Sequence, residues 1–194
     1  MNKKGLLIIL SGPSGVGKGT IRQEILKDPS LKLFYSVSLT TRQIRPGEME
    51  GREYYFVTDE QFDENLAKGN LLEWNAFVHH RYGTPKDKVE EKRLAGYNVL
   101  LEIDVNGAEQ VVKNLADDNR LCTIFLMPPS FKELEDRIRK RSTEPDDVIQ
   151  ERLSKAANEM KKAKLYHHVI VNDKIDEASE AIKEIIRAKM SADE

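Results

Sequence analysis

The sequence contains a single cysteine, Cys122, among its 194 residues. One cysteine cannot form an internal disulfide, and it cannot supply the thiolate cluster of a structural zinc site. Cys122 lies within the apolar run Leu121–Met127, which is typical of a thiol in a hydrophobic core. The four histidines occur as two adjacent pairs. Because neighbouring side chains project in different directions, a histidine metal site is disfavoured.

The sequence also lacks a long apolar run and a strong excess of charge of either sign. No segment approaches the ~20 apolar residues that a membrane helix requires. The short run Leu6–Leu10 leads directly into a glycine-rich segment with no cleavage site, unlike a signal peptide. The formal net charge is −2, which argues against a general nucleic-acid binder. We therefore expect a cytoplasmic protein that binds neither membranes nor nucleic acid.

The glycine-rich segment carries the strongest functional signal. It follows the apolar run Leu6–Leu10, and a helical pattern opens at Thr20. A buried strand, a glycine-rich loop and a helix are the context in which G-x-x-x-x-G-K binds phosphate. Backbone N–H groups turn inward, the helix dipole adds to them, and Lys18 reaches the β- and γ-phosphates. The alternative is a purely structural turn. The predicted ATP-binding residues here are Gly12, Pro13, Ser14, Gly15, Val16, Gly17, Lys18, Gly19 and Thr20.

One position departs from the usual phosphate-loop pattern. Gly19 stands where Ser or Thr normally ligates magnesium, and the hydroxyl comes one residue later at Thr20. A switch-type GTPase is disfavoured, because it needs that hydroxyl on the metal. A dinucleotide-binding fingerprint fails as well, since the last glycine of G-x-G-x-x-G is missing.

Four apolar runs separated by helical patterns predict an α/β fold with a parallel sheet flanked by helices. Ligands of such sheets bind at the carboxyl ends of the strands, so Asp104 and Asn172 should face the same cleft as the phosphate loop. Thr84 is the expected N-cap of a helix, and Ser130 with Glu133 forms a capping box for another. The runs are Leu6–Leu10, Val99–Ile103, Leu121–Met127 and Val169–Val171.

Two stretches interrupt this alternation. Residues 34–84 are predicted to form a mostly β lobe, with Tyr54–Val57 and Leu71–Val78 as its expected strands. Residues 142–147 form a turn-rich gap between two helices that carry arginines.

Two groups of arginines could bind phosphate. Arg42 and Arg45 lie three residues apart in the lobe and could hold a terminal phosphate with their guanidinium forks. The alternative is a solvated basic loop. Arg137 and Arg141 share one helix face, and with Arg152 they could fold over a triphosphate. The alternative for this second group is ion pairing at the surface with Glu133, Glu135, Asp136 and Glu151.

Together, the phosphate loop and the arginine groups resemble the guanylate kinase family, in which the γ-phosphoryl of ATP passes to GMP or dGMP. The resemblance covers Leu6 to Lys189, and its most specific stretch is Ser38-Leu-Thr-Thr-Arg-Gln-Ile-Arg-Pro-Gly-Glu48. It implies a P-loop kinase core with a parallel sheet, a mostly β GMP-binding lobe and a helical lid. The implied boundaries are 1–33, 85–129 and 156–194 for the core, 34–84 for the lobe and 130–155 for the lid.

The resemblance also assigns residues to the two nucleotides. A carboxylate suits guanine because it accepts from N1–H and the 2-amino group together. Guanine is assigned to Ser38, Glu73 and Thr84, the GMP phosphate to Arg42, Arg45, Tyr54 and Tyr82, and the acidic positions beside the nucleotides to Glu102 and Asp104. Asn172 is placed beside the adenine of ATP, and the implied catalytic cations are Lys18, Arg42, Arg137, Arg141 and Arg152.

Gly19, Asn106 and Ser142 depart from the family pattern, but none of them removes a phosphate-binding side chain. We expect Mg²⁺ to be held through phosphates and water, with Thr20 and Asp104 kept as candidate ligands. No general base is expected, because the acceptor is already an anionic phosphate oxygen. Two rival functions stay open: a kinase for another nucleotide or small metabolite, and a catalytically inactive module that binds proteins. The oligomeric state is also open.

Overall fold

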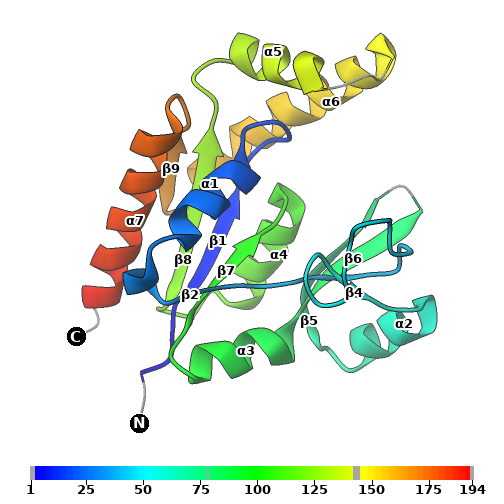
Figure 1. The fold of residues 1–194 in the computed structure, drawn as a ribbon, viewed down its shortest axis with the longest axis vertical. Helices are drawn as coiled ribbons and strands as arrows, with labels where there is room; N and C mark the ends of the chain where they lie inside the picture. The colour runs from blue at the N-terminus through cyan, green and yellow to red at the C-terminus, as the bar shows by residue number, and fades with distance from the viewer. Residues whose placement is uncertain (1–2, 78, 142–144, 193–194) are drawn as a thin grey trace.

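The computed structural model describes residues 3–77, 79–141 and 145–192, and for Phe77 and Arg141 it describes the backbone alone. Its larger sheet has the strand order β2-β7-β1-β8-β9 (Figure 1). Every neighbouring pair of strands in this sheet is parallel. The strands are β1 (Leu7–Ser11), β2 (Leu33–Tyr35), β7 (Asn98–Glu102), β8 (Leu121–Met127) and β9 (His168–Val171).

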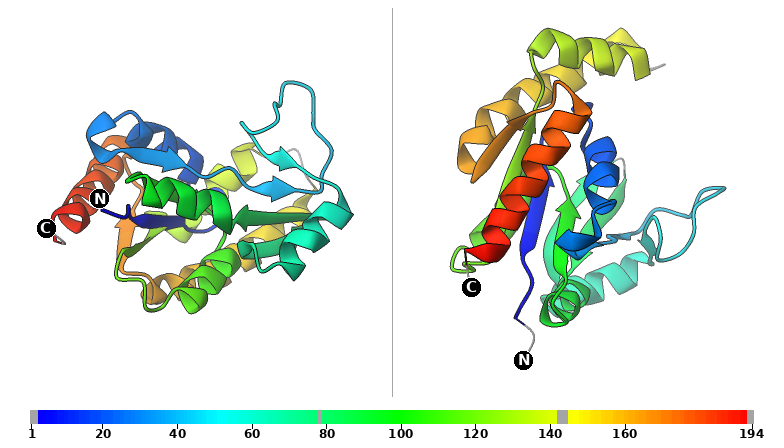
Figure 2. Two further views of the ribbon diagram at one scale, coloured as in Figure 1. Left: turned by 90° about the horizontal axis from the view of Figure 1, so that it is seen from below. Right: turned by 60° about the vertical axis from the view of Figure 1, so that its left-hand side comes forward.

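Helices cover both faces of this sheet, because successive side chains of a strand point to opposite sides. Ile8 and Leu10 of β1 pack on one face, and Leu7 and Ile9 pack on the other. All four side chains are fully buried. Figure 2 shows the sheet enclosed between the two helix layers. The first layer contains α1 (Lys18–Leu26) and α7 (Ile175–Ser191), and the second contains α3 (Lys86–Leu94) and α4 (Val105–Asn114).

Two helices, α5 (Phe131–Arg141) and α6 (Asp146–Met160), stand at the carboxyl end of the sheet, beside the phosphate loop (Figure 1). One bond of the expected capping box of α5 is present: the Ser130 Oγ accepts from the Glu133 backbone N–H at 3.1 Å. Leu134, Ile138, Ile149 and Leu153 attach the two helices to the core that α1 and α7 share. The chain also contains two short 3-10 helices, η1 (Pro29–Leu31) and η2 (Lys161–Leu165).

A second, smaller sheet lies to one side of the first and has the order β4-β3-β6-β5 (Figure 1). It is mixed: β3 runs parallel to β4 and antiparallel to β6, and β5 pairs antiparallel with β6. A helix, α2 (Asp59–Ala67), packs beside it and begins with a capping box between Thr58 and Gln61. The strands are β3 (Leu39–Thr40), β4 (Tyr55–Phe56), β5 (Leu71–Phe77) and β6 (His80–Pro85).

The structure confirms the four predicted strands of the parallel sheet, and it adds β2. Phe34 and Tyr35 of β2 pair with β7, so they belong to the larger sheet although they fall inside the range predicted for the lobe. A strand of three half-buried residues is too short to show a periodic pattern. The predicted N-cap Thr84 is wrong: α3 begins at Lys86 with Pro85 as its N-cap, because Thr84 is buried in β6. No helix in the described part of the chain is long and apolar enough to cross a membrane.

Candidate phosphoryl-transfer site

The phosphate loop joins β1 to α1, as the sequence predicts. Gly17 is the N-cap of α1 and has φ 101°, a left-handed conformation that glycine adopts without strain. A Cβ on Gly17 would lie 2.7 Å from the Nδ2 of Asn172. Two requirements, backbone conformation and space, therefore fix glycine at this position. A cavity of about 380 Å³ lies against the loop and is lined by Ser14, Gly15, Gly17, Lys18, Gly19, Thr20, Gln23 and Glu102.

Lys18 is folded onto its own loop. Its Nζ donates to the carbonyl oxygens of Gly12 at 2.6 Å and Pro13 at 3.1 Å. Burial lowers the pKa of Lys18, and the carboxylates of Glu102, Glu159 and Asp104 oppose that shift. The ammonium group is therefore partly desolvated and has exchangeable carbonyl partners. A bound phosphate would offer it stronger, charge-assisted hydrogen bonds.

Asn172 lies beside the loop, as its place at the end of β9 predicts. Its Nδ2 donates to the Val16 carbonyl at 2.8 Å, and its own carbonyl accepts from both terminal nitrogens of Arg137 at 3.2 Å. Arg137 thus ties α5 to the loop through Asn172, and it also forms an ion pair with Glu133 at 3.2 Å. Arg152 of α6 reaches the Oγ of Ser14 at 3.3 Å. The side chain of Arg141, as well as Ser142, lies outside the described residues.

A second cavity, of about 570 Å³, opens between the two sheets. It brings together most of the residues that the resemblance assigns to GMP. Thr84 is the exception, because it lies behind Glu73. The lining residues are Ser38, Arg42, Arg45, Tyr54, Glu73, Asn75, Ala76, Tyr82, Glu102, Ile103, Asp104, Asn106 and Lys155. Glu102 lines both this cavity and the phosphate-loop cavity, so the two cavities share a wall.

Arg42 is the most tightly held cation of the second cavity. Its side chain is 9% exposed, and its guanidinium group forms a two-pronged ion pair with Glu48, at 2.8 and 3.0 Å. It also stands 5.4 Å from the ring centroid of Tyr54. The hydrogen bond to Glu48 raises the pKa of Arg42, and Tyr82 adds to that shift. These contacts hold the guanidinium group in place, with both terminal nitrogens bonded to Glu48, so a phosphate would bind its remaining N–H groups or displace Glu48.

Glu73 is buried at the other end of this cavity. Its Oε1 accepts a hydrogen bond from the Oγ1 of Thr84 at 2.5 Å. Burial raises the pKa of Glu73 to about 7, and the nearby charge of Asp104 adds to the shift. The Glu73 carboxylate fits against α4 only because residue 107 has no side chain: a Cβ on Gly107 would lie 2.6 Å from the Glu73 Oε2.

Asp104 organises the wall beside Glu73. Its Oδ1 accepts from the Gly107 backbone N–H at 2.8 Å and caps α4, and its Oδ2 accepts from the Nδ2 of Asn75 at 2.9 Å. Gln110, one turn further along α4, holds the backbone N–H and C=O of Trp74 at 3.1 and 2.8 Å. The strand that carries Glu73 is therefore bound along its length to the core helix.

The sequence model of the guanylate kinase family matches residues 4–189. The chain belongs to the guanylate kinase family. It is 46% identical to a guanylate kinase of Lactiplantibacillus plantarum over 189 residues, which cover 97% of this chain and 90% of that protein. It is 45% identical to one of Latilactobacillus sakei, over 97% of this chain and 92% of that protein. The crystal structure of guanylate kinase from Anaplasma phagocytophilum is similar with a TM-score of 0.76 at 33% identity, covering 98% of this chain and 88% of that one.

Two charged residues of α6 at this guanylate kinase site, Lys155 and Glu159, were not predicted from the sequence. Lys155 of α6 lines the second cavity, and Glu159, one turn further on, lies 3.9 Å from its Nζ. Burial raises the pKa of Glu159, and the charges of Lys155 and Lys18 oppose that shift. The spacing of Arg152, Lys155 and Glu159 puts them on one face of α6. That spacing is visible in the sequence, but it does not show that the face is turned toward the cleft.

Oxygen ligands for a magnesium ion are present, although no group of three or more His, Cys, Asp or Glu among the described residues is arranged to hold a metal by itself. The Oε2 of Glu102 is buried without a hydrogen-bond partner, with Arg22 as an ion-pair partner at 3.2 Å. Thr20 and Glu102 both line the phosphate-loop cavity. Mg²⁺ keeps several waters and binds through one or two carboxylates together with substrate phosphates, so this sparse set of oxygen atoms fits it.

Proposed function

We propose that the two cavities are the two halves of one phosphoryl-transfer site, with ATP on the phosphate loop and GMP between the two sheets. Membership of the guanylate kinase family makes the chain a nucleoside monophosphate kinase that phosphorylates GMP. The observation that carries the proposed arrangement is the shared wall at Glu102. A donor in one cavity and an acceptor in the other would meet at that wall.

Glu73 is proposed to read the guanine base. The N1–H and 2-amino groups of guanine are both donors, and only an ionised carboxylate offers two acceptors without a competing donor. Thr84 holds one carboxylate oxygen in place. Adenine lacks this pair of donors and would leave the buried charge unsatisfied, which costs about 1–3 kcal/mol. Ser38, which lines the same cavity, is the proposed second contact.

Arg42, Arg45, Tyr54 and Tyr82 are proposed to hold the phosphate of GMP. They line the cavity together, and Tyr54 and Tyr82 pack edge to face with ring centroids 5.7 Å apart. Glu48 binds both terminal nitrogens of Arg42 and holds the guanidinium group in place beside the cavity. The clamp would place one phosphate oxygen toward Glu102 and the phosphate loop. Because that oxygen is already anionic, the reaction needs no general base.

On the donor side, the proposed cations are Lys18, Arg137, Arg141 and Arg152, with Asn172 beside the adenine, and Lys155 adds a cation from the second cavity. Bound Mg²⁺, held by the phosphates, water, Glu102 and Thr20, with Asp104 as a further candidate, would neutralise charge on the transferring group. These cations separate two mutually repelling anions, so catalysis is mainly positioning and charge stabilisation. Closure of α5 and α6 over the loop would exclude water, which otherwise competes as acceptor.

The division into a core (1–33, 85–129 and 156–194), a GMP-binding lobe (34–84) and a lid (130–155) is part of this proposal, with Phe34 and Tyr35 assigned to the core because of their pairing in β2. The proposed compartment is the cytoplasm, where both nucleotides occur. The site is proposed to accept GMP and dGMP.

The test is a coupled assay of ADP release with ATP, Mg²⁺ and a panel of GMP, dGMP, AMP, CMP and UMP. The expected result is turnover with GMP and dGMP alone. Turnover with AMP or UMP at the rate seen with GMP would contradict the role of Glu73. A protein that binds GMP without releasing ADP would instead be an inactive binding module.

A further inference from the structure

Asn75 of β5 places an uncharged amide among the charged side chains of the second cavity. Its side chain lines that cavity and is half-buried. Its Nδ2 donates to the Oδ2 of Asp104 at 2.9 Å. An asparagine amide carries two N–H donors and a carbonyl acceptor, so this bond uses only one of its groups. No described residue donates to the Oδ1 of Asn75, which is therefore left as an acceptor for a ligand.

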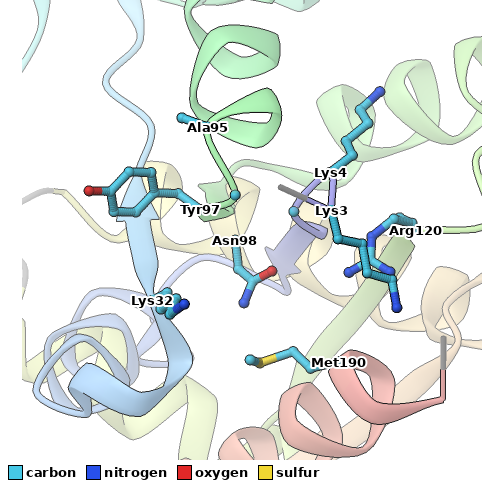
Figure 3. A pocket seen from close by; sticks show the side chains of 10 residues that line it. Lys3, Lys4, Lys32, Ala95, Tyr97, Asn98, Arg120 and Met190 are labelled. Atoms are coloured by element: carbon cyan, nitrogen blue, oxygen red, sulfur yellow. The ribbon is translucent and has the colours of Figure 1, made fainter. Parts of the chain in front are cut away.

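Asn98, at the opposite end of the parallel sheet, is an amide with a purely structural role (Figure 3). It is buried, its Oδ1 accepts from the Leu6 N–H, and its Nδ2 donates to the Leu31 carbonyl, both at 2.8 Å. Both halves of that amide join neighbouring segments, as is usual for buried polar groups. In Asn75 only the Nδ2 half is used in this way.

The Asn75 amide is held in one orientation. Its partner Asp104 is fixed in turn, because the Asp104 Oδ1 accepts from the Gly107 backbone N–H at 2.8 Å. A carboxylate oxygen accepts hydrogen bonds, so the Nδ2 of Asn75 and not its Oδ1 must face Asp104. The Oδ1 is thus turned away from Asp104. A ligand that donates to it meets a side chain already in place, which lowers the entropic cost of binding.

Asn75 lies between the two ends of the proposed GMP site. Glu73, the proposed reader of guanine, precedes it by two residues, so both side chains project from one face of β5, roughly 7 Å apart along the strand. Tyr82, a member of the proposed phosphate clamp, is the partner of Asn75 on β6. The longer side chain of Tyr82 packs against Tyr54, with ring centroids 5.7 Å apart, and so reaches past Asn75 into the clamp. The amide therefore stands between the group that binds the base and the groups that bind the phosphate.

The ribose of GMP joins the base to the phosphate, so the sugar lies opposite Asn75 when both ends are bound. Its 2′- and 3′-hydroxyls can each donate to a carbonyl oxygen and accept from an N–H group. The Oδ1 and the second N–H of Asn75 match both properties. Given the proposed placement of GMP between the two sheets, on which this role depends, we propose that Asn75 binds the hydroxyl edge of the ribose and makes the enzyme favour GMP over nucleotides with deoxy sugars. dGMP is then a substrate that is used less efficiently than GMP.

The test compares GMP with 2′,3′-dideoxy-GMP as acceptors, in the native chain and in Asn75→Ala. kcat/KM is measured for both nucleotides, and the fluorescence of Trp74, the single tryptophan, gives their dissociation constants independently of turnover. The native chain should favour GMP by about three- to tenfold, the effect of one hydrogen bond. In Asn75→Ala this preference should disappear, because GMP loses a contact that the dideoxy nucleotide never makes. Whichever of 2′-dGMP and 3′-dGMP behaves like the dideoxy nucleotide identifies the bonded hydroxyl.

The matched control is Asn114→Ala. The Nδ2 of Asn114, on α4, donates to the Leu72 carbonyl of β5 at 3.4 Å. Both variants therefore remove an asparagine bond between β5 and the segment that forms α4, but Asn114 lies outside the second cavity. The control should keep the native preference for GMP. Melting curves check that both variants are folded.

Equal losses with GMP and the dideoxy nucleotide in Asn75→Ala would overturn the role in sugar binding, and so would the same change of preference in the control. A loss that disappears with inosine monophosphate, which lacks the 2-amino group of guanine, would place Asn75 on the base instead. A native chain that phosphorylates GMP and the dideoxy nucleotide equally well overturns this role alone. A native chain that phosphorylates neither contradicts the proposed function as well.

Discussion

Thr84 and Glu73 face each other across neighbouring strands, and the hydroxyl of Thr84 donates to the carboxylate of Glu73 over 2.5 Å. The bond stabilises the ionised carboxylate, whereas burial acts in the opposite direction and raises the pKa of Glu73 to about 7. Glu73 is therefore close to half-ionised near neutral pH before GMP binds. Its charge is the property on which guanine recognition depends.

The first prediction concerns the pH dependence of kcat/KM for GMP. Guanine presents two donors, so the protonated form of Glu73 should not bind it. Below a pH of about 7, kcat/KM for GMP should fall about tenfold per pH unit, because this ratio reports the ionisation of the free enzyme. The substrate phosphate also titrates in this region, at about pH 6. Glu73→Gln separates the two effects, since the pH profile of kcat/KM in this variant should show only the titration of the substrate phosphate.

Glu73→Gln should also affect stability and recognition in opposite directions. Folding raises the pKa of Glu73 from 4.5 to about 7, so protonation of Glu73 stabilises the folded native chain at low pH. This contribution to the free energy of unfolding is lost as the pH rises from about 4.5 to about 7. At pH 8, where the native chain buries a charge, the ligand-free variant should be more stable by roughly 1–3 kcal/mol. Near pH 4 the two proteins should melt alike.

In the same variant, kcat/KM for GMP should fall about 5- to 150-fold, because a donor replaces an acceptor opposite guanine. The KM for ATP should stay nearly unchanged. Equal losses for both nucleotides would show a folding defect. Unchanged kinetics with GMP would remove Glu73 from the guanine site.

Gly107→Ala tests the gap that Glu73 occupies. The new methyl group would stand 2.6 Å from the Glu73 Oε2, so the carboxylate must move. Alanine suits a helix better than glycine by about 0.5–1 kcal/mol, so α4 should still form. The KM for GMP should rise about tenfold while the KM for ATP stays constant. In a Glu73→Ala background the substitution should change nothing further, and an equal effect in both backgrounds would disprove the steric explanation.

Lys18→Met should leave GMP binding intact and abolish most turnover. The variant loses the donor-side ammonium group, whereas the residues of the second cavity are untouched. Loss of one group that stabilises transition-state charge typically costs about 10²–10³ in kcat. Fluorescence of Trp74, the single tryptophan and the neighbour of Glu73, gives an independent measure of GMP binding. Near-normal turnover would show that Lys18 does not act on the phosphates.

Lys155→Gln tests the cation that α6 contributes to the second cavity. Its side chain is 54% exposed, so solvent screening should limit the effect to about three- to tenfold in kcat. The matched control is Lys132→Gln, which replaces an exposed lysine on α5 and should leave kcat unchanged. The melting temperatures of both should equal that of the native chain. A change of the same size in the control would mean that Lys155 acts only through the net charge of the lid.

The sequence by itself determined what depends on short-range patterns. The phosphate loop, the four long strands of the parallel sheet and the capped start of α5 follow from spacings of a few residues. The arginines at positions 42 and 45 were found in the same way. Such patterns suffice because backbone hydrogen bonding, glycine conformation and strand periodicity are set by neighbours in the chain.

Only the tertiary structure decided the properties that arise between distant segments. Thr84 looked like a helix cap, and its hydroxyl instead meets Glu73, eleven residues away in the chain, because β5 and β6 pair. The raised pKa of Glu73 requires burial against α4, and the gap that admits it is made by Gly107. Lys155 could not be placed in the cleft from its spacing alone, because that spacing fixes a helix face and not the direction in which the face is turned. Burial, charge and close approach are set by which segments pack together, and that information lies in the fold.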